Sequence, residues 1–296
     1  MGIRECLLLS NGDIELIATT RVGPRILCYR PLNGENVLAE VPNIAQPNSL
    51  GMWKPYGGHR LWAAPEELPR TYYPDNDPVE VESFDGHSVR LRAPVERMTH
   101  LQKEIRITLE EKGSGVSIEH IITNCGDTLV ELAPWALTIV HTGGTAIIPQ
   151  EPFRSHEEYL LPARPIVLWH FTDLTDPRWN IGKHLIQLSI DPAREAPQKI
   201  GVLDKQGWAA YYRNGMLFVK EFEYLPDTIY PDYGCNCETY TAGSFMELES
   251  LGMMQVLQPG ESATHQERWR LFSGITLPND EEKRAEEIGR LLDMKR

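Results

Sequence analysis

The sequence predicts one large antiparallel β-sandwich with a short helix at its C-terminus. Three observations predict this fold class. Apolar and polar residues alternate along most of the chain, turns rich in glycine and proline separate the alternating segments, and helical periodicity is confined to the last residues. The chain has 296 residues, of which 41% are hydrophobic, and this suffices for a sizeable core. We therefore expect a single domain over residues 1–296.

The N-terminal half contains four expected strands. Apolar and polar residues alternate over residues 14–18, 88–93 and 105–109, as they do in strands with one buried face. A fourth strand, residues 116–122, follows Lys112–Gly115, whose two glycines supply the positive φ that hairpin turns need. These segments predict antiparallel neighbours joined by short turns.

The C-terminal half continues the same pattern. Residues 208–212 and 217–222 flank an Asn-Gly pair, which is a strong hairpin signal between two apolar runs. Residues 245–251 and 262–272 are expected to close the sandwich, and a Pro-Gly turn lies between them.

Helical signals are confined to residues 281–296. Asn279 can cap this helix, three acidic residues follow the cap, and apolar side chains recur with helical spacing. We expect the helix to pack on the edge of the sandwich. Two loop-rich segments, residues 42–77 and 153–182, are long for a compact domain, so we expect them to have a functional role.

Charge and composition narrow the choice of partners. The net charge of −13 disfavours nucleic acid and anionic membranes, because both are recognised by basic surfaces. The N-terminal apolar stretch is too short for a signal peptide or a membrane span. The five cysteines are irregularly spaced, so we expect a cytoplasmic protein with reduced thiols. Cys235 and Cys237 are too close for a usual zinc pair and lack a second pair, so we expect no metal.

The densest candidate site is Gly57–Glu66, with the sequence GGHRLWAAPE. His59 can titrate near neutral pH, Arg60 offers a planar fork of donors, and Trp62 offers a flat apolar face for a sugar ring. We expect these three residues and Glu66 to contact a ligand from a loop. The alternative is a structural loop that Trp62 pins to the core.

A second candidate is the strand that contains Trp135. Alternation places Trp135, Leu137 and Ile139 on one face, and a regular strand would add His141 to that face. We expect Trp135 and His141 to contact the ligand. The alternatives are a core tryptophan and a histidine whose hydrogen bonds are satisfied at a strand end.

A third candidate is the acidic strand near residue 248. Glu247 and Glu249 share one face, while Met246 and Leu248 point the other way. If the apolar face is the core, the two carboxyl groups face either solvent or a cleft. A solvated acidic face is the simpler alternative, but two acids in a cleft can raise each other's pKa and provide a general base.

In this order, the three stretches resemble the aldose 1-epimerase (galactose mutarotase-like) superfamily over most of the chain. Four further motifs carry the resemblance: a T-N-x-G-D turn at Thr123–Asp127, an F-x-x-x-E strand at Phe245–Glu249, an L-x-P-G-E turn at Leu257–Glu261 and a W-x-L strand end at Trp269–Leu271. The glycine-rich loop resembles an uncharacterised branch more closely than the galactose enzymes. The resemblance implies the mutarotase-like sandwich and a reaction that needs no cofactor.

The resemblance also implies residue roles for the interconversion of sugar anomers. In the family a carboxylate removes the proton of the C1 hydroxyl, and a histidine protonates the ring oxygen. Glu249 takes the position of the base, whereas Trp135 stands at the position of the acid histidine. Indole is no acid, so we expect His59 to supply the proton, with His141 as the alternative. Glu247 is expected to bind substrate.

Three functions follow as hypotheses. The first is a mutarotase-like isomerase that acts on an aldose or a modified aldose. The second is a non-catalytic carbohydrate-binding or sensor domain, in which Trp62 and Trp135 stack on a sugar ring. The third is a glycoside hydrolase or lyase on the same scaffold, since one fold can host several chemistries.

Overall fold

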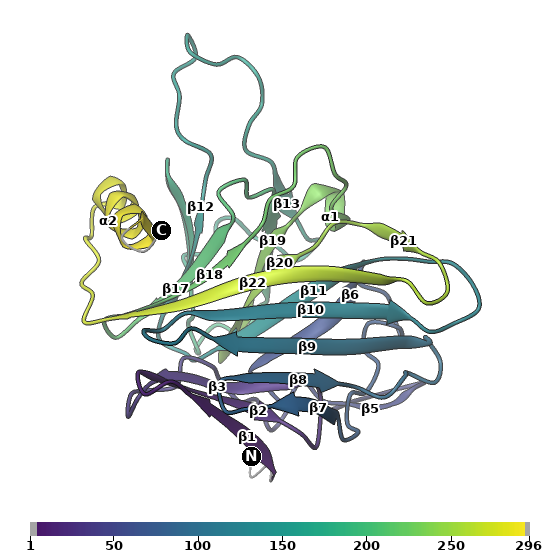
Figure 1. The fold of residues 1–296 in the computed structure, drawn as a ribbon. Coiled ribbons are helices and arrows are strands. Elements are labelled where there is room, and N and C mark those ends of the chain that lie inside the picture. Colours follow the sequence, from purple (N-terminus) through teal and green to yellow (C-terminus); the bar gives the residue numbers. More distant parts are fainter. Residues whose placement is uncertain (1–4, 294–296) are drawn as a thin grey trace.

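The computed structural model describes residues 5–293 and contains two large antiparallel sheets that pack face to face, which confirms the predicted sandwich (Figure 1). In spatial order the first sheet contains β1 (Cys6–Ser10), β2 (Ile14–Thr19), β3 (Arg25–Pro31), β6 (His59–Ala64), β11 (Val130–Val140), β20 (Phe245–Leu251), β19 (Cys237–Ala242), β16 (Gln198–Val202) and β13 (Ile166–Leu168). A short strand, β21 (Gln255–Leu257), pairs with one end of β11.

The second sheet also has ten strands. In spatial order they are β14 (Trp179–Ile181), β15 (Leu185–Ser189), β12 (Thr145–Pro149), β17 (Trp208–Arg213), β18 (Met216–Phe222), β22 (Ser262–Ser273), β10 (Val116–Asn124), β9 (Leu101–Leu109), β8 (Ser88–Arg92) and β7 (Glu80–Phe84). A separate hairpin is formed by β4 (Gln46–Asn48) and β5 (Gly51–Trp53). Each predicted strand is present, with ends shifted by a few residues, because alternation marks the buried positions more sharply than the strand ends.

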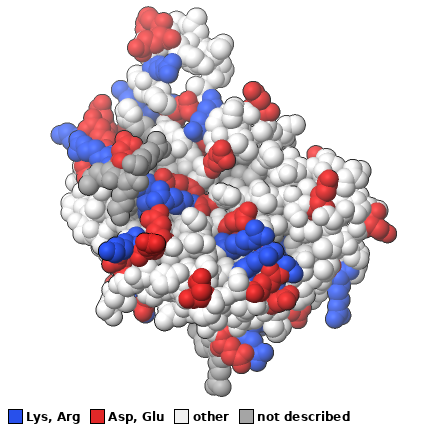
Figure 2. All heavy atoms as spheres, viewed as in Figure 1, with Lys and Arg blue, Asp and Glu red and all other residues white. Residues whose placement is uncertain are grey.

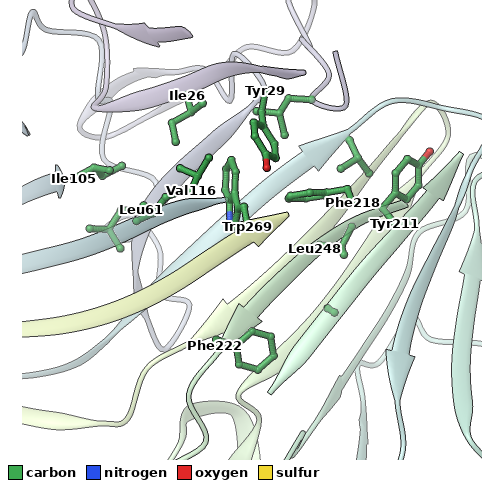
Figure 3. Close-up of a cluster of buried hydrophobic side chains, with 14 of the residues drawn as sticks. Ile26, Tyr29, Leu61, Ile105, Val116, Tyr211, Phe218, Phe222, Leu248 and Trp269 are labelled. Atoms are coloured by element: carbon green, nitrogen blue, oxygen red, sulfur yellow. The ribbon is translucent and has the colours of Figure 1, made fainter. Parts of the chain in front are cut away.

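The main core lies between the two sheets (Figure 3). Tyr29 of the first sheet meets Phe218 and Trp269 of the second, with ring centroids 5.9 and 5.5 Å from its own. Phe218 and Trp269 also pack edge to face at 5.3 Å. Aromatic pairs in these geometries stabilise the interior beyond the area that they bury. The core fixes which residue of each strand points inward and which points outward.

The C-terminal helix is α2 (Glu281–Asp293), and residues 294–296 of the predicted helix lie outside the described residues. Its cap differs from the prediction, because the Asp280 carboxylate accepts the hydrogen bond from the Lys283 amide at 3.0 Å. The apolar stripe of the helix packs with residues of β12, β17 and β18, so it covers the outer face of the second sheet and not an edge.

The remaining segments are mostly loops. One turn of helix, α1 (Pro231–Gly234), connects β18 to β19, and two of its residues, Asp232 and Tyr233, have positive φ. The loop-rich segment 42–77 contains the β4–β5 hairpin and strand β6, and 153–182 contains β13 and β14. Within residues 5–293, the helices are too short or too polar to cross a membrane.

Candidate functional site

A pocket of about 410 Å³ lies on the outer face of the first sheet, over β6, β11, β20, β19 and β16. Its volume is within the range of about 300–1,000 Å³ that is usual for small-molecule sites. Strand residues of the first sheet form its floor. Trp53 of the β4–β5 hairpin and the loop residues Tyr72, Trp169 and Phe171 form its walls. The two loop-rich segments of the sequence therefore both contribute to this pocket.

The strand register determines which side chains reach the floor. Leu137 of β11 pairs with Arg60 of β6 and with Glu249 of β20, so these three residues point to the pocket side. The next residue of β11, Thr138, pairs with His59 and with Leu248. The side chains of these three residues point toward the second sheet. Leu248 is fully buried in the main core, which confirms that the outer face carries the acidic residues.

Aromatic rings form one side of the pocket. The centroid of Trp62 lies 5.9 Å from Trp53, 5.0 Å from Tyr72 and 5.3 Å from Trp135. The Arg60 guanidinium lies over Trp62 at 4.3 Å and near Trp53 at 5.4 Å. Flat apolar rings beside fixed donors match a sugar, which has apolar C–H faces and a rim of hydroxyl groups.

Glu247 is the titratable carboxyl group on the pocket floor. One of its oxygens lies 3.3 Å from the Arg60 guanidinium, and 12% of its side chain is exposed. Burial raises the pKa of Glu247 to about 7; Arg60 opposes this shift, and Glu249 adds to it. A carboxyl group with a pKa near the working pH can both accept and donate a proton.

Tyr240 lies beside Glu247 on the neighbouring strand β19. Its ring packs against Phe171 at 6.4 Å and against Phe245 at 5.9 Å. Burial raises the pKa of Tyr240 to about 12, so its hydroxyl keeps its proton near neutral pH and can donate a hydrogen bond.

Lys199 of β16 lines the pocket and joins two carboxyl groups that lie behind the floor. Its ammonium lies 2.7 Å from Glu238 and 3.1 Å from Glu249. It also lies between two indoles, 4.7 Å from the ring centroid of Trp135 and 4.6 Å from that of Trp169. The Trp135 indole N–H donates to the same Glu249 oxygen at 2.8 Å.

The charge state of this network follows from its burial. Burial raises the pKa of Glu238 well above its ordinary value, which favours the neutral acid. Burial opposes the charged form of Lys199, but Glu238 and Glu249 outweigh it and raise the lysine pKa. The consistent arrangement is a neutral Glu238 beside a Lys199–Glu249 ion pair. The second oxygen of Glu249 has no hydrogen-bond partner among residues 5–293.

His59 does not lie where the sequence predicted. The stretch after the two glycines is strand β6, in which each residue is buried, and His59 points away from the pocket. Gly57 and Gly58 have positive φ and are packed against backbone of this chain: a Cβ on Gly58 would lie 2.0 Å from the Ile26 carbonyl. The expected convergence of His59 and Glu249 is therefore wrong, because the two residues lie on opposite faces of one sheet.

His59 instead belongs to a polar cluster between the sheets. Its Nε2 lies 2.7 Å from His120 Nε2, and its Nδ1 lies 2.9 Å from the Thr138 hydroxyl. His120 Nδ1 donates to the His265 carbonyl at 3.1 Å, so His120 Nε2 accepts the hydrogen from His59. Burial lowers the pKa of His59 well below its ordinary value, which matches this neutral pair.

The same cluster has the composition of a metal site but not its electrostatics. One ligand atom each of His59, His120 and Glu267 lie within 4.8 Å of one another. However, the buried Lys220 ammonium is 2.7 Å from a Glu267 oxygen and already neutralises that carboxylate. A cation here would face this ammonium and would break the His59–His120 hydrogen bond, so the residues do not fit a metal.

Of the other predicted site residues, five line the pocket and two do not. The pocket lining includes Arg60, Trp62, Glu66, Trp135 and Glu247.

Two predicted residues lie elsewhere. Glu249 is 1% exposed behind the floor. His141 follows the end of β11, where its amide donates to the Val37 carbonyl and burial lowers its side-chain pKa. Among the described residues, the pocket lining contains no histidine.

Sequence reasoning assigned no role to Lys199, Glu238 or Tyr240. The alternation of Glu238 and Tyr240 in β19 could have indicated a shared outward face. Lys199 gave no such signal, because it is distant in sequence and reaches the site only through the pairing of β16 with β19.

Comparison with known proteins gives the fold a context. No protein-family model and no curated protein sequence matches this chain. Among solved structures, a galactose mutarotase-like protein from Lactobacillus casei has a TM-score of 0.59 at 8% identity, covering 90% of this chain and 100% of that one. A candidate aldose 1-epimerase from Escherichia coli K12 has a TM-score of 0.52 at 15% identity, covering 91% and 99%.

A third solved structure, a candidate aldose 1-epimerase from Klebsiella pneumoniae, has a TM-score of 0.58 at 11% identity, covering 97% of this chain and 82% of that one. These likenesses confirm the fold that the sequence motifs implied. The chain has the galactose mutarotase-like β-sandwich, and its pocket lies on one sheet face of that sandwich.

Proposed function

We propose that this protein binds a saccharide in the pocket on the first sheet and interconverts its anomers, with Glu247 as the group that exchanges protons. The observation that carries the proposal is the position of Glu247: its carboxyl group lies on the floor of an aromatic-walled pocket, beside the Arg60 guanidinium. The fold is shared with candidate aldose 1-epimerases, and this supports the same reaction class.

One carboxyl group can perform both proton transfers of this reaction. In the neutral acid form, the O–H of Glu247 donates to the ring oxygen while its carbonyl oxygen accepts the proton of the C1 hydroxyl. The bond between C1 and the ring oxygen breaks, and an open-chain aldehyde forms. Rotation about C1–C2 and the reverse transfers give the other anomer. Both sugar oxygens are attached to C1, so two oxygens of one carboxyl group can face them together.

This mechanism needs no histidine in the pocket. It replaces the sequence-based assignment of Glu249 as base and His59 as acid. We propose that Glu249 instead holds Lys199 in place, and that the N–H of Lys199 not directed at Glu238 or Glu249 donates to a sugar hydroxyl. Trp62 and Trp135 supply the apolar surface for the ring.

A second candidate function is saccharide binding without catalysis. The engagement of Glu249 by Trp135 and Lys199 favours it, because this carboxylate cannot reach a sugar without breaking a buried network. The same observation counts against a glycoside hydrolase or lyase, since two carboxyl groups would have to face one bond. As to location, we propose a reducing cytoplasmic compartment, on the strength of the buried thiols of Cys28, Cys235 and Cys237.

The test measures binding and anomer exchange separately. Saturation-transfer NMR with neutral aldoses, aldose phosphates and uronic acids identifies a bound sugar, and exchange spectroscopy gives its anomerisation rate. We expect Glu247→Gln to bind the sugar and to lose about 10²–10⁴-fold in rate. Glu131→Gln, an exposed carboxyl group on β11, is the matched control and should keep the full rate.

Three outcomes separate the candidates. Binding with no acceleration by the wild-type protein selects the non-catalytic function. Full activity in Glu247→Gln refutes the assignment of the proton-exchanging group. If none of the three sugar classes binds, the proposed function as a whole is refuted.

A further inference from the structure

We propose that residues 152–165, here called the arm, form a dimerisation surface for a second copy of this chain. The arm projects from the body of the sandwich between β12 and β13 (Figure 1). This proposal does not depend on the proposed function, because the arm lies outside the pocket.

The arm exposes apolar side chains to an unusual extent. Leu160 and Leu161 are 74% and 69% exposed, and Phe153 is 53% exposed. Single exposed apolar residues are common, but a contiguous group on a projecting segment indicates an interaction surface.

The charges of the arm are separated along its length. The turn at its outer end carries Glu157 and Glu158, both exposed. Three basic residues, Arg154, Arg164 and Lys205, line a hollow of about 340 Å³ together with one acidic residue, Glu151. Figure 2 shows acidic atoms at the outer end of the projection and basic atoms below them. The acidic tip and the basic foot are therefore complementary within a single chain.

A second copy fits this pattern better than other partners. In a two-fold dimer with antiparallel arms, the acidic tip of each arm meets the basic foot of the other. The symmetry axis therefore generates two copies of the same tip-to-foot contact. The exposed apolar residues between tip and foot, Leu160 and Leu161, then pack across the axis. The net charge of −13 disfavours an anionic membrane as the occupant.

Sedimentation velocity of the full chain at tens of micromolar tests the dimer. We expect the wild-type protein to sediment at twice the mass of the 33.7-kDa chain. Replacing Leu160 and Leu161 with Glu should raise the dissociation constant by at least about 30-fold. Leu129→Glu, at a residue 58% exposed in the connection between β10 and β11, is the matched control and should remain dimeric. Circular dichroism should be unchanged in each variant.

Charge reversal tests the tip-to-foot contact. Glu157→Lys with Glu158→Lys should dissociate the dimer, and adding Arg164→Glu with Lys205→Glu to the same chain should restore it. A wild-type monomer, or a dimer that persists when both leucines are replaced, would overturn the proposal. A failure of the fourfold reversal to restore the dimer would overturn the antiparallel contact.

Discussion

Replacing Lys199 with Met should destabilise the protein strongly at neutral pH and much less in mild acid. The substitution keeps an apolar side chain between Trp135 and Trp169 but removes the cation that faces Glu238 and Glu249. The side chain of Lys199 is 7% exposed and those of both glutamates are 0% exposed, so water cannot replace the lost partner. Removing one partner of a buried ion pair typically costs about 3–5 kcal/mol.

The pH dependence of the free energy of unfolding gives a second estimate of this cost. Glu238 already favours its neutral form, so the variant must bury one charged carboxylate, that of Glu249, or protonate it. Protonating an ordinary glutamate, with a pKa of about 4.3, costs about 3.7 kcal/mol at pH 7 and about 1 kcal/mol at pH 5. The loss of stability should therefore shrink by roughly 2–3 kcal/mol between these two pH values.

Urea unfolding followed by fluorescence and circular dichroism measures this difference, provided that the two signals coincide. The double variant Lys199→Met with Glu249→Gln is the control, and it should recover most of the lost stability because it removes the unpaired charge. A cost below about 1 kcal/mol at pH 7, or a cost that does not fall on acidification, would refute the buried ion pair as described.

Further predictions concern the site and the core. If the neutral acid form of Glu247 is the catalyst, the anomerisation rate should fall as the pH rises through about 7, and a rate that rises instead would exclude this mechanism. Burial lowers the pKa of His265 to about 3; its neutral form therefore contributes stability that is present above about pH 6.5 and is lost by roughly 1.4 kcal/mol per unit as the pH falls toward 3. Replacing His265 with Asn should flatten this part of the stability profile, and an unchanged acid slope would contradict it. Phe218→Ala should cost about 3–5 kcal/mol in urea unfolding, because its ring packs on Tyr29 and Trp269 in the main core.

The sandwich was predictable from the sequence because its strands have one buried face. Alternation located β2, β8 and β9, and the Asn-Gly turn located the β17–β18 hairpin. Strand β6 was not recognised, because its residues are buried on both faces and show no alternation.

The candidate site was predictable in composition but not in orientation. Arg60, Trp62, Trp135 and Glu247 reach one pocket, as the residue types suggested. The face of His59 depends on the register of β6 against β11, and a shift of one residue would have reversed it. No local pattern in a single sequence specifies that register.

The position of Lys199 depends on strand order, which is also non-local. It meets Glu249 through the sheet order β20–β19–β16, across about 50 residues of sequence. The helix cap was not predictable for a different reason. Asn279 and Asp280 are both good capping residues, and the structure uses Asp280.

A crystal structure of the Glu247→Gln variant with a bound aldose tests the central claim most directly. Gln keeps the shape of the side chain but cannot exchange the proton, so the sugar should remain as a defined anomer. The account predicts the ring against Trp62 or Trp135, with the C1 hydroxyl and the ring oxygen each about 2.6–3.2 Å from the Gln side chain. A sugar bound outside the pocket, or one whose C1 faces His141 or Glu249 in place of residue 247, would contradict it.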